Sequence, residues 1–183
     1  VKNMCGVLQE QVFINYDGQQ GLAKAKGVDW IYEEETPLRD HIREGDFKLH
    51  RGDVPMAAVG SGLAYSMGIS PRFVSPIEIY CPSRTRKLSM SNPISSIEAV
   101  KVWPSSIFSV NNDVDAELMI LPIEKMRELL EYDDEVSAVE IRLTEGTDSK
   151  TLKNLQKEIG ERLGPDFKVK DRFQQNESLY KMM

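Results

Sequence analysis

Two segments near the start of the chain are rich in apolar residues. Residues 7–14 are rich in apolar, β-forming side chains, and residues 22–28 form a second segment of this kind. Asp17-Gly18 lies between them, and this dipeptide adopts the positive φ angles of a tight turn at little cost. The pattern therefore predicts an antiparallel β-hairpin.

The middle of the chain, residues 32–113, has a less regular pattern. Thr36-Pro37 predicts the start of a short helix, because proline is favoured in the first helical turn. Residues 61–67 predict a second short helix, with Ser61 as its N-cap.

Strand patterns return after this helix. Alternation at residues 77–81 predicts one strand, which ends at Pro82. Residues 100–103 and 107–110 predict two more, on either side of Pro104. Proline has no amide hydrogen for sheet pairing, so Pro104 should bend or bulge the strands beside it.

The last third of the chain has the most regular pattern. Residues 118–121 predict a short buried strand, and Pro122 then opens a helix with one apolar face. Alternation at residues 139–143 predicts a strand with one solvent-exposed face.

A second helix is predicted to follow, from a cap at Asp148 to a stop at Gly164-Pro165. Phe167 and Val169 indicate a final short strand. The predicted order of the last third is therefore β-α-β-α-β.

Together these patterns predict an α+β protein. The regular first and last thirds, residues 1–31 plus 114–183, are expected to form one α/β part. Residues 32–113 are expected to form a β-rich insert, with joints near residues 32–36 and 111–115.

Composition narrows the class of protein. The chain has 183 residues, of which 40% are hydrophobic and 28% charged, as is typical of a globular protein. The net charge of −6 argues against a nucleic-acid partner, which needs a basic surface. No apolar run approaches the roughly 20 residues of a membrane span. Both ends, Val1 and the helical pattern of residues 177–183, are expected to be cuts within a longer protein.

Few residues suggest catalysis or metal binding. His41 and His50 have no third ligand at metal spacing, so both are expected on the surface or in packing. Cys5 and Cys81 also lack a metal-binding spacing, and whether they pair is left open. The sequence therefore predicts no catalytic, cofactor-binding or metal site.

Gly60-Ser61-Gly62 shares features with two functional motifs but matches neither. A serine nucleophile elbow needs glycine where Val59 stands. A dinucleotide-binding fingerprint needs its third glycine where Tyr65 stands.

Two further groups of side chains have a functional and a structural interpretation. Asp113, Asp115 and Glu117 could perform acid–base chemistry or bind Ca²⁺, although solvated loops and helix ends are the favoured interpretation. Trp30 and Trp103 are expected in the core rather than on a recognition surface.

Four segments, in this order and spacing, resemble the extracytoplasmic domains of FtsX/MacB-type ABC-transporter permeases. Residues 54–68, VPMAAVGSGLAYSMG, are similar to the glycine-rich segment of that family. Residues 118–130, LMILPIEKMRELL, and the strand at 136–143 resemble the segments that follow it. Residues 171–180, DRFQQNESLY, resemble the approach to the second membrane helix. The similarity is greatest to lipoprotein-releasing permeases of the LolC/LolE type.

The resemblance implies a periplasmic domain of an inner-membrane permease. In that family the domain has a split βαβ-type Porter subdomain, here residues 1–31 plus 114–183, and an inserted β-rich Sabre subdomain, here residues 32–113. The implied partners are the membrane helices of the same full-length chain, a second permease subunit and a cytoplasmic ATPase subunit. Lipoprotein-releasing members also act on a lipoprotein and a periplasmic carrier.

The carrier-contacting hairpin of such permeases would fall in residues 83–99. This chain has Ser91-Asn92-Pro93 in place of a Pro-Gly tip. The basic tract beside it could also bind phosphate or a lipid headgroup, or be a solvated loop. The expected partner-contact residues are Arg84, Arg86, Lys87, Asn92 and Pro93.

We therefore expect a non-catalytic permease domain that transmits ATP-driven motion to the extracytoplasmic side. Lipoprotein release is one transport activity that the resemblance implies. The alternatives are a free-standing secreted binding module of the same fold, an interaction module with exposed strand edges, and an enzyme that uses the Asp113 cluster.

Overall fold

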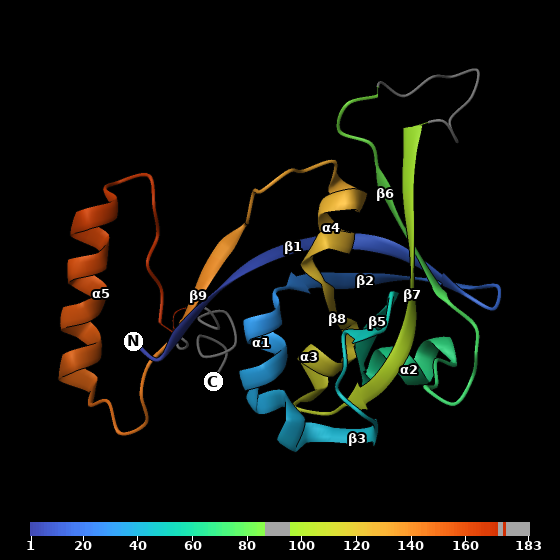
Figure 1. The fold of residues 1–183 in the computed structure, drawn as a ribbon, viewed down its shortest axis with the longest axis horizontal. Coiled ribbons are helices and arrows are strands. Elements are labelled where there is room, and N and C mark those ends of the chain that lie inside the picture. The colour runs from blue at the N-terminus through green and yellow to red at the C-terminus, as the bar shows by residue number, and fades with distance from the viewer. Residues whose placement is uncertain (87–95, 172–173, 175–183) are drawn as a thin grey trace. The chain divides into compact units, whose positions relative to one another are not determined.

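The computed structural model describes residues 1–86, 96–171 and 174. By its internal contacts the chain divides into two units, Asn3–Ile141 and Val1–Lys2 with Arg142–Met183. The larger unit contains the sheet and most helices, and the smaller unit contains one long helix (Figure 1).

The first two strands form the predicted hairpin. Strand β1 (Asn3–Tyr16) pairs with the antiparallel strand β2 (Gln19–Val28) along its length from Val7 to Tyr16. The turn between them has positive φ at both Asp17 and Gly18, at 48° and 83°. The prediction from the Asp-Gly dipeptide is confirmed.

Six strands of the larger unit form a closed cycle of hydrogen-bonded neighbours, in the order β7-β6-β1-β2-β8-β5 and back to β7. The parallel pairing of β5 with β7 closes the cycle. Two short strands extend this cycle: β3 pairs with β7, and β4 pairs with β5. Strand β9 pairs with β1. The strands not yet bounded are β3 (Ile42–Gly45), β4 (His50–Arg51), β5 (Val54–Gly60), β6 (Ile77–Pro82), β7 (Ile97–Phe108), β8 (Leu118–Pro122) and β9 (Ala138–Arg142).

Short helices connect these strands. In chain order the helices are α1 (Trp30–Glu35), the 3₁₀-helix η1 (Pro37–His41), α2 (Ser61–Met67), α3 (Asn112–Glu117), α4 (Ile123–Leu130) and, in the smaller unit, α5 (Ser149–Leu163). Thr36 caps η1 through its hydroxyl, which accepts a hydrogen bond from the amide of Leu38. Predicted helix starts at Pro37 and after Pro122 are confirmed.

The apolar residues form two clusters on opposite faces of the strands. The larger cluster joins inward side chains such as Ile14 and Ile79 to Leu63 of α2 and Met126 of α4. Each fully buried side chain of this size contributes about 1.5–3 kcal/mol to the free energy of folding. The smaller cluster includes Val7, Val28, Leu38, Phe47, Leu49, Phe108 and Ile120.

The smaller cluster covers only part of its face of the sheet. Val7 and Phe13 lie on the same side of β1, because successive side chains of a strand alternate between the two faces. Val7 is 3% exposed, whereas Phe13 is 59% exposed. The face is therefore covered at the start of β1 and open at its end, next to β6 and β7.

Three local predictions need correction. Ser61 lies inside α2, and Gly60 is the N-cap, without a side-chain hydrogen bond. The two strands predicted around Pro104 form one strand, β7, with a register shift opposite Ala57 and Ala58. The proline therefore bulges the strand without ending it.

The expected strand through Phe167 and Val169 is also wrong, because residues 165–170 have no regular secondary structure. Phe167 is 61% exposed, so most of its apolar ring is not buried against other side chains. The carbonyl of Val169 accepts a hydrogen bond from the side chain of Gln156 on α5, at 2.8 Å. This segment is therefore fixed to the helix rather than to another strand.

The mixed helix and strand content agrees with the predicted α+β class, and strands dominate. Strands from residues 32–113 pair directly with β1 and β8, which flank that segment in sequence. The division into residues 1–31 plus 114–183 and residues 32–113 stays a prediction. Among the described helices, none has both the length and the hydrophobicity to cross a bilayer. The helical pattern predicted at residues 177–183 lies outside the described residues.

Candidate functional site

The connection between β6 and β7 holds all the residues predicted to contact a partner. Figure 1 shows β6 and β7 continuing together past their crossing with β1 towards this connection. Arg84 and Arg86 lie at its start and are exposed. Lys87, Asn92 and Pro93 lie outside the described residues.

The start of the connection is held by several local contacts, and we call residues 83–86 the root segment. The amide of Ser83 donates to the carbonyl of Ser96 at 2.8 Å, which extends the β6–β7 pairing by one step. Arg86 forms an ion pair with Glu98 on β7. The guanidinium of Arg84 lies over the ring of Tyr132, 4.1 Å from its centroid, in a cation–π contact.

Glu131, at the end of α4, binds the root segment through its carboxylate. Thr85 and Ser83 donate to it through their hydroxyls, at 2.6 and 2.7 Å. The amides of Arg84 and Thr85 donate to it at 2.8 and 3.1 Å. These hydrogen bonds, with that from the Thr85 hydroxyl the largest, lower the pKa of Glu131 to about 2. The carboxylate is therefore ionised at neutral pH.

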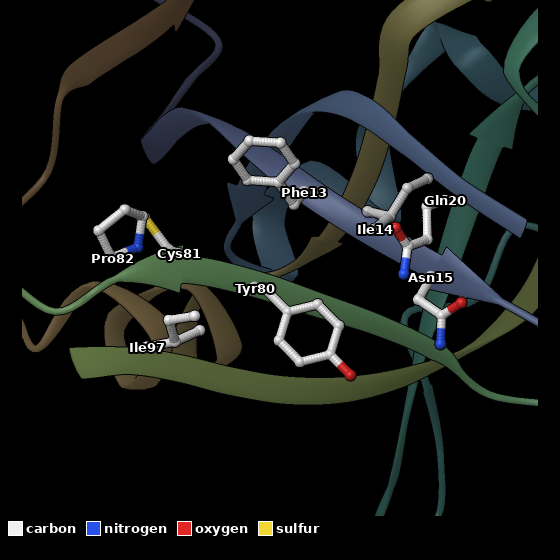
Figure 2. A pocket seen from close by; sticks show the side chains of 8 residues that line it. All are labelled: Phe13, Ile14, Asn15, Gln20, Tyr80, Cys81, Pro82 and Ile97. Atoms are coloured by element: carbon white, nitrogen blue, oxygen red, sulfur yellow. The ribbon is translucent and has the colours of Figure 1, made fainter. Parts of the chain in front are cut away.

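An apolar depression lies on the open face of the sheet, next to the root segment. Figure 2 shows Phe13 of β1 beside Tyr80 of β6, its partner across the strands, with Pro82 and Ile97 further along. The depression has a volume of about 310 Å³. Its lining residues are Phe13, Ile14, Asn15, Gln20, Tyr80, Cys81, Pro82 and Ile97.

The polar edge of this face centres on Glu78. Its carboxylate accepts hydrogen bonds from Lys101, Tyr80 and Asn15, at 2.9, 2.7 and 2.9 Å. These interactions lower the pKa of Glu78 to about 2, and the hydrogen bond from Lys101 is the largest cause. Because this charge is balanced within the face, the surface offers apolar contact and hydrogen bonding more than net charge.

The three acidic residues considered as a catalytic group are differently placed: Asp113 is exposed in the first turn of α3, whereas the other two make structural contacts. Asp115 is buried, and its carboxylate accepts from Ser109 Oγ at 2.9 Å, Val110 N at 2.8 Å and Ser61 Oγ at 3.3 Å. Glu117 forms an ion pair with Lys24 at 2.6 Å. These interactions assign Asp115 and Glu117 to structural contacts.

Gly60 and Gly62 are explained by the position of Asp115. A Cβ atom at Gly60 would lie 2.5 Å from the carbonyl oxygen of Asp115, and one at Gly62 would lie 3.0 Å from the Cα of Ala116. The two glycines therefore allow α2 to begin against the backbone of α3. Sequence reasoning tested this motif against nucleotide and serine sites and missed its packing role.

Both histidines are exposed, as predicted. The His50 ring lies between two carboxylates, with Nε2 at 2.5 Å from Glu124 and Nδ1 at 4.0 Å from Glu33. Cys5 and Cys81 are buried thiols, and burial raises the pKa of Cys81. In the described part of the chain, no group of three or more His, Cys, Asp or Glu side chains is placed to hold a metal ion.

The two tryptophans depart from the predicted core positions. Trp30 is 68% exposed, because the next two residues of α1, Ile31 and Tyr32, supply the side chains that pack against the smaller cluster. Trp103 is partly buried, and its indole donates to the carbonyl of Val74 at 3.1 Å.

No protein-family model matches the sequence, and no curated protein sequence matches it. Solved structures do match. The periplasmic region of MacB from Actinobacillus actinomycetemcomitans superposes with a TM-score of 0.55 at 8% identity, over 87% of this chain and 66% of that one. The extracellular domain of the ABC-type transporter YknZ from Gram-positive bacteria gives 0.53 at 12% identity, over 84% and 70%.

The chain thus spans just under two thirds of the MacB region that it matches. At these identities the likeness concerns the fold. This chain therefore shares its fold with the periplasmic region of MacB and the extracellular domain of YknZ.

Proposed function

We propose that this chain is an extracytoplasmic domain of an ABC-transporter permease and that it transmits ATP-driven motion to the far side of the membrane. The observation that carries the proposal is the shared fold with the periplasmic region of MacB and the extracellular domain of YknZ. The resemblance of residues 54–68 and 118–130 to FtsX/MacB-type permeases supports it independently.

The domain would act without catalysing a reaction itself. Its membrane helices, on the same full-length chain, would connect it to a second permease subunit and to a cytoplasmic ATPase. The natural protein would then lie in the inner membrane, with this domain in the periplasm. Closure of the ATPase subunits on ATP would move the helices and swing the attached domain.

A partner surface is proposed at the β6–β7 connection and the depression beside it. Arg84 and Arg86 are exposed residues of the root segment, and Lys87, Asn92 and Pro93 complete the proposed contact set. Phe13 and Ile97 add exposed apolar area, at 59% and 44% exposure, which suits a protein surface better than a small polar ligand.

Lipoprotein release is the specific activity that we propose within this class. It rests on the resemblance of the sequence to LolC/LolE-type permeases. Under this proposal the cargo is a lipoprotein, and a periplasmic carrier binds near the β6–β7 connection. The Porter-like part, residues 1–31 plus 114–183, and the Sabre-like part, residues 32–113, would move together with the membrane helices.

The test is hydrogen exchange in the full-length protein, reconstituted in vesicles with its ATPase. We expect the exchange rates of this domain to differ between the nucleotide-free state and the state trapped with ATP and vanadate. An ATPase variant that binds but does not hydrolyse ATP is the control, and it should give the trapped pattern with ATP alone. Identical exchange in all states would contradict the proposed transmission of motion.

A second experiment separates lipoprotein release from other transport. Vesicles loaded with an acylated lipoprotein are energised with ATP, and the released lipoprotein is measured with and without a soluble carrier. Release that requires ATP supports the specific proposal. ATP-dependent motion of the domain without lipoprotein release would still support a permease function. It would contradict the proposal that the cargo is a lipoprotein.

A further inference from the structure

One carboxylate binds the root segment to α4, a helix that is far from it in sequence. The Glu131 carboxylate accepts four hydrogen bonds from three consecutive residues, Ser83, Arg84 and Thr85. Two come from hydroxyls and two from backbone amides, at distances from 2.6 to 3.1 Å. Hydrogen bonds to an ionised acceptor are about twice as strong as those between neutral groups.

The backbone at Glu131 has a conformation that is unfavourable for a residue with a side chain. Glu131 is the C-cap of α4 and has φ 54° and ψ 45°, in the left-handed region. Glycine is favoured at such a helix end because it has no Cβ. A glutamate in this conformation destabilises the local backbone. The four hydrogen bonds to its carboxylate offset that loss of stability.

The root segment is also connected on its other side. Ser83 Oγ accepts from the amide of Arg86 at 3.1 Å, while Arg86 pairs with Glu98 of β7. The residue after Glu131, Tyr132, holds the guanidinium of Arg84. The root segment is therefore placed between the end of α4 and the first residues of β7.

We infer that Glu131 is a positioning residue, which locks residues 83–86 to the end of α4 and so sets the direction of the chain where it leaves β6. A role of Glu131 in positioning a partner-binding surface rests on the proposed function. The locking of residues 83–86 to α4 does not depend on that proposal. Any displacement of α4 would pass directly to the base of the connection.

The test is hydrogen exchange of single amides in the 183-residue chain, measured by NMR. Glu131→Gly removes the carboxylate and keeps a residue that tolerates the left-handed backbone. We expect the amides of Arg84 and Thr85 to exchange roughly tenfold faster, as for the loss of one charge-assisted hydrogen bond. Ile79 and Val100, in the buried strands, should keep their rates.

Glu128→Ala is the matched control, since Glu128 is an exposed glutamate on α4 that pairs with Lys125. This variant should leave the Arg84 and Thr85 amides at their original rates. Unchanged rates in Glu131→Gly would overturn the inference. So would an equal acceleration at Ile79 and Val100, because the effect would then be a general loss of stability.

A double-mutant cycle supplies a readout that general destabilisation would not reproduce. Thr85→Val removes one of the two hydroxyl donors and should accelerate exchange at Arg84 in the original chain. In the Glu131→Gly background the same change should add nothing, because its acceptor is gone. Additive effects would overturn the lock. These readouts need no partner, so the inference can survive failure of the permease proposal, and the reverse also holds.

Discussion

Gly60 and Gly62 lie where the first turn of α2 meets the backbone of α3, and they differ in how much room each has. A Cβ at Gly60 meets a carbonyl oxygen and a Cα of Asp115, at 2.5 and 2.8 Å. At Gly62 the nearest atoms are 3.0–3.2 Å away. The atoms at both sites belong to the backbone, so neither clash can be relieved by a side-chain rotation.

Gly60→Ala should therefore destabilise the protein by about 3 kcal/mol, the range of an overpacked core. Gly62→Ala should cost less, about 1 kcal/mol, because the overlap is smaller. Urea unfolding followed by circular dichroism measures both free energies of unfolding. Equal stabilities for Gly60→Ala and the original chain would show that α2 and α3 are not in close contact.

Glu78 shows how one charged residue can make stability depend on pH. Its hydrogen bonds, first that from Lys101 and then those from Tyr80 and Asn15, lower its pKa from 4.5 to about 2. A carboxyl whose pKa is lower in the folded state stabilises that state when ionised. This contribution is present above pH 4.5 and is lost as the pH falls towards 2.

The free energy of unfolding should therefore fall less between pH 5 and pH 2 in Glu78→Gln than in the original chain. Urea unfolding at several pH values gives the two slopes. Glu98→Gln is a comparison variant on the neighbouring strand, where the glutamate pairs with Arg86 instead of a network of three donors. Parallel pH profiles for Glu78→Gln and the original chain would contradict the role of this network.

At the scale of elements, α5 shows how local signals set the ends of a helix. The Asp148 carboxylate accepts from the amide of Thr151 at 2.8 Å at the start, and Gly164 has φ 84° at the end. Both ends were predicted from the sequence, because a cap requires only residues within one turn. Between them, Gly160 lies in the helix interior, where Val169 is the one described side chain near its Cβ position, at 3.9 Å.

Gly160→Ala should stabilise α5 by about 1 kcal/mol, because alanine has the higher helix propensity and space is available. Gly164→Ala should destabilise it by about 1 kcal/mol, because its positive φ disfavours a side chain with Cβ. Amide exchange in α5 measures both effects. The same sign for the two substitutions would contradict the described helix end.

The whole molecule depends on the larger unit for its core. Among the described residues, every member of both hydrophobic clusters lies between Cys5 and Tyr132. The cycle of six strands is complete within the same range. Hydrophobic burial is the main favourable term in folding, so this part of the chain holds what it needs to fold.

A chain that ends at Ile141 should therefore keep a cooperative unfolding transition. Its buried amides in β1, β6 and β7 should retain slow hydrogen exchange. The matched substitution Ile120→Ala, at a fully buried position, should lower the free energy of unfolding by about 2–5 kcal/mol in both the long and the short chain. A short chain without a cooperative transition would show that residues 142–183 are required for folding.

The sequence alone determined the features that depend on near neighbours. The Asp17-Gly18 turn, the start of η1 at Pro37 and the cap at Asp148 each follow from a few adjacent residues. Alternation identified β6 and β9 because the period of a strand is visible without knowing its partner. The α+β class follows from these elements.

Only the tertiary structure decided which surfaces are covered and which distant groups meet. Val7 and Phe13 follow the same alternation, yet the smaller cluster covers one and leaves the other open. Glu131 and Ser83 are 48 positions apart, and Asp115 and Ser61 are 54 apart. Such pairs form only when the strands close their cycle, because a hydrogen bond depends on distances that the path of the whole chain sets.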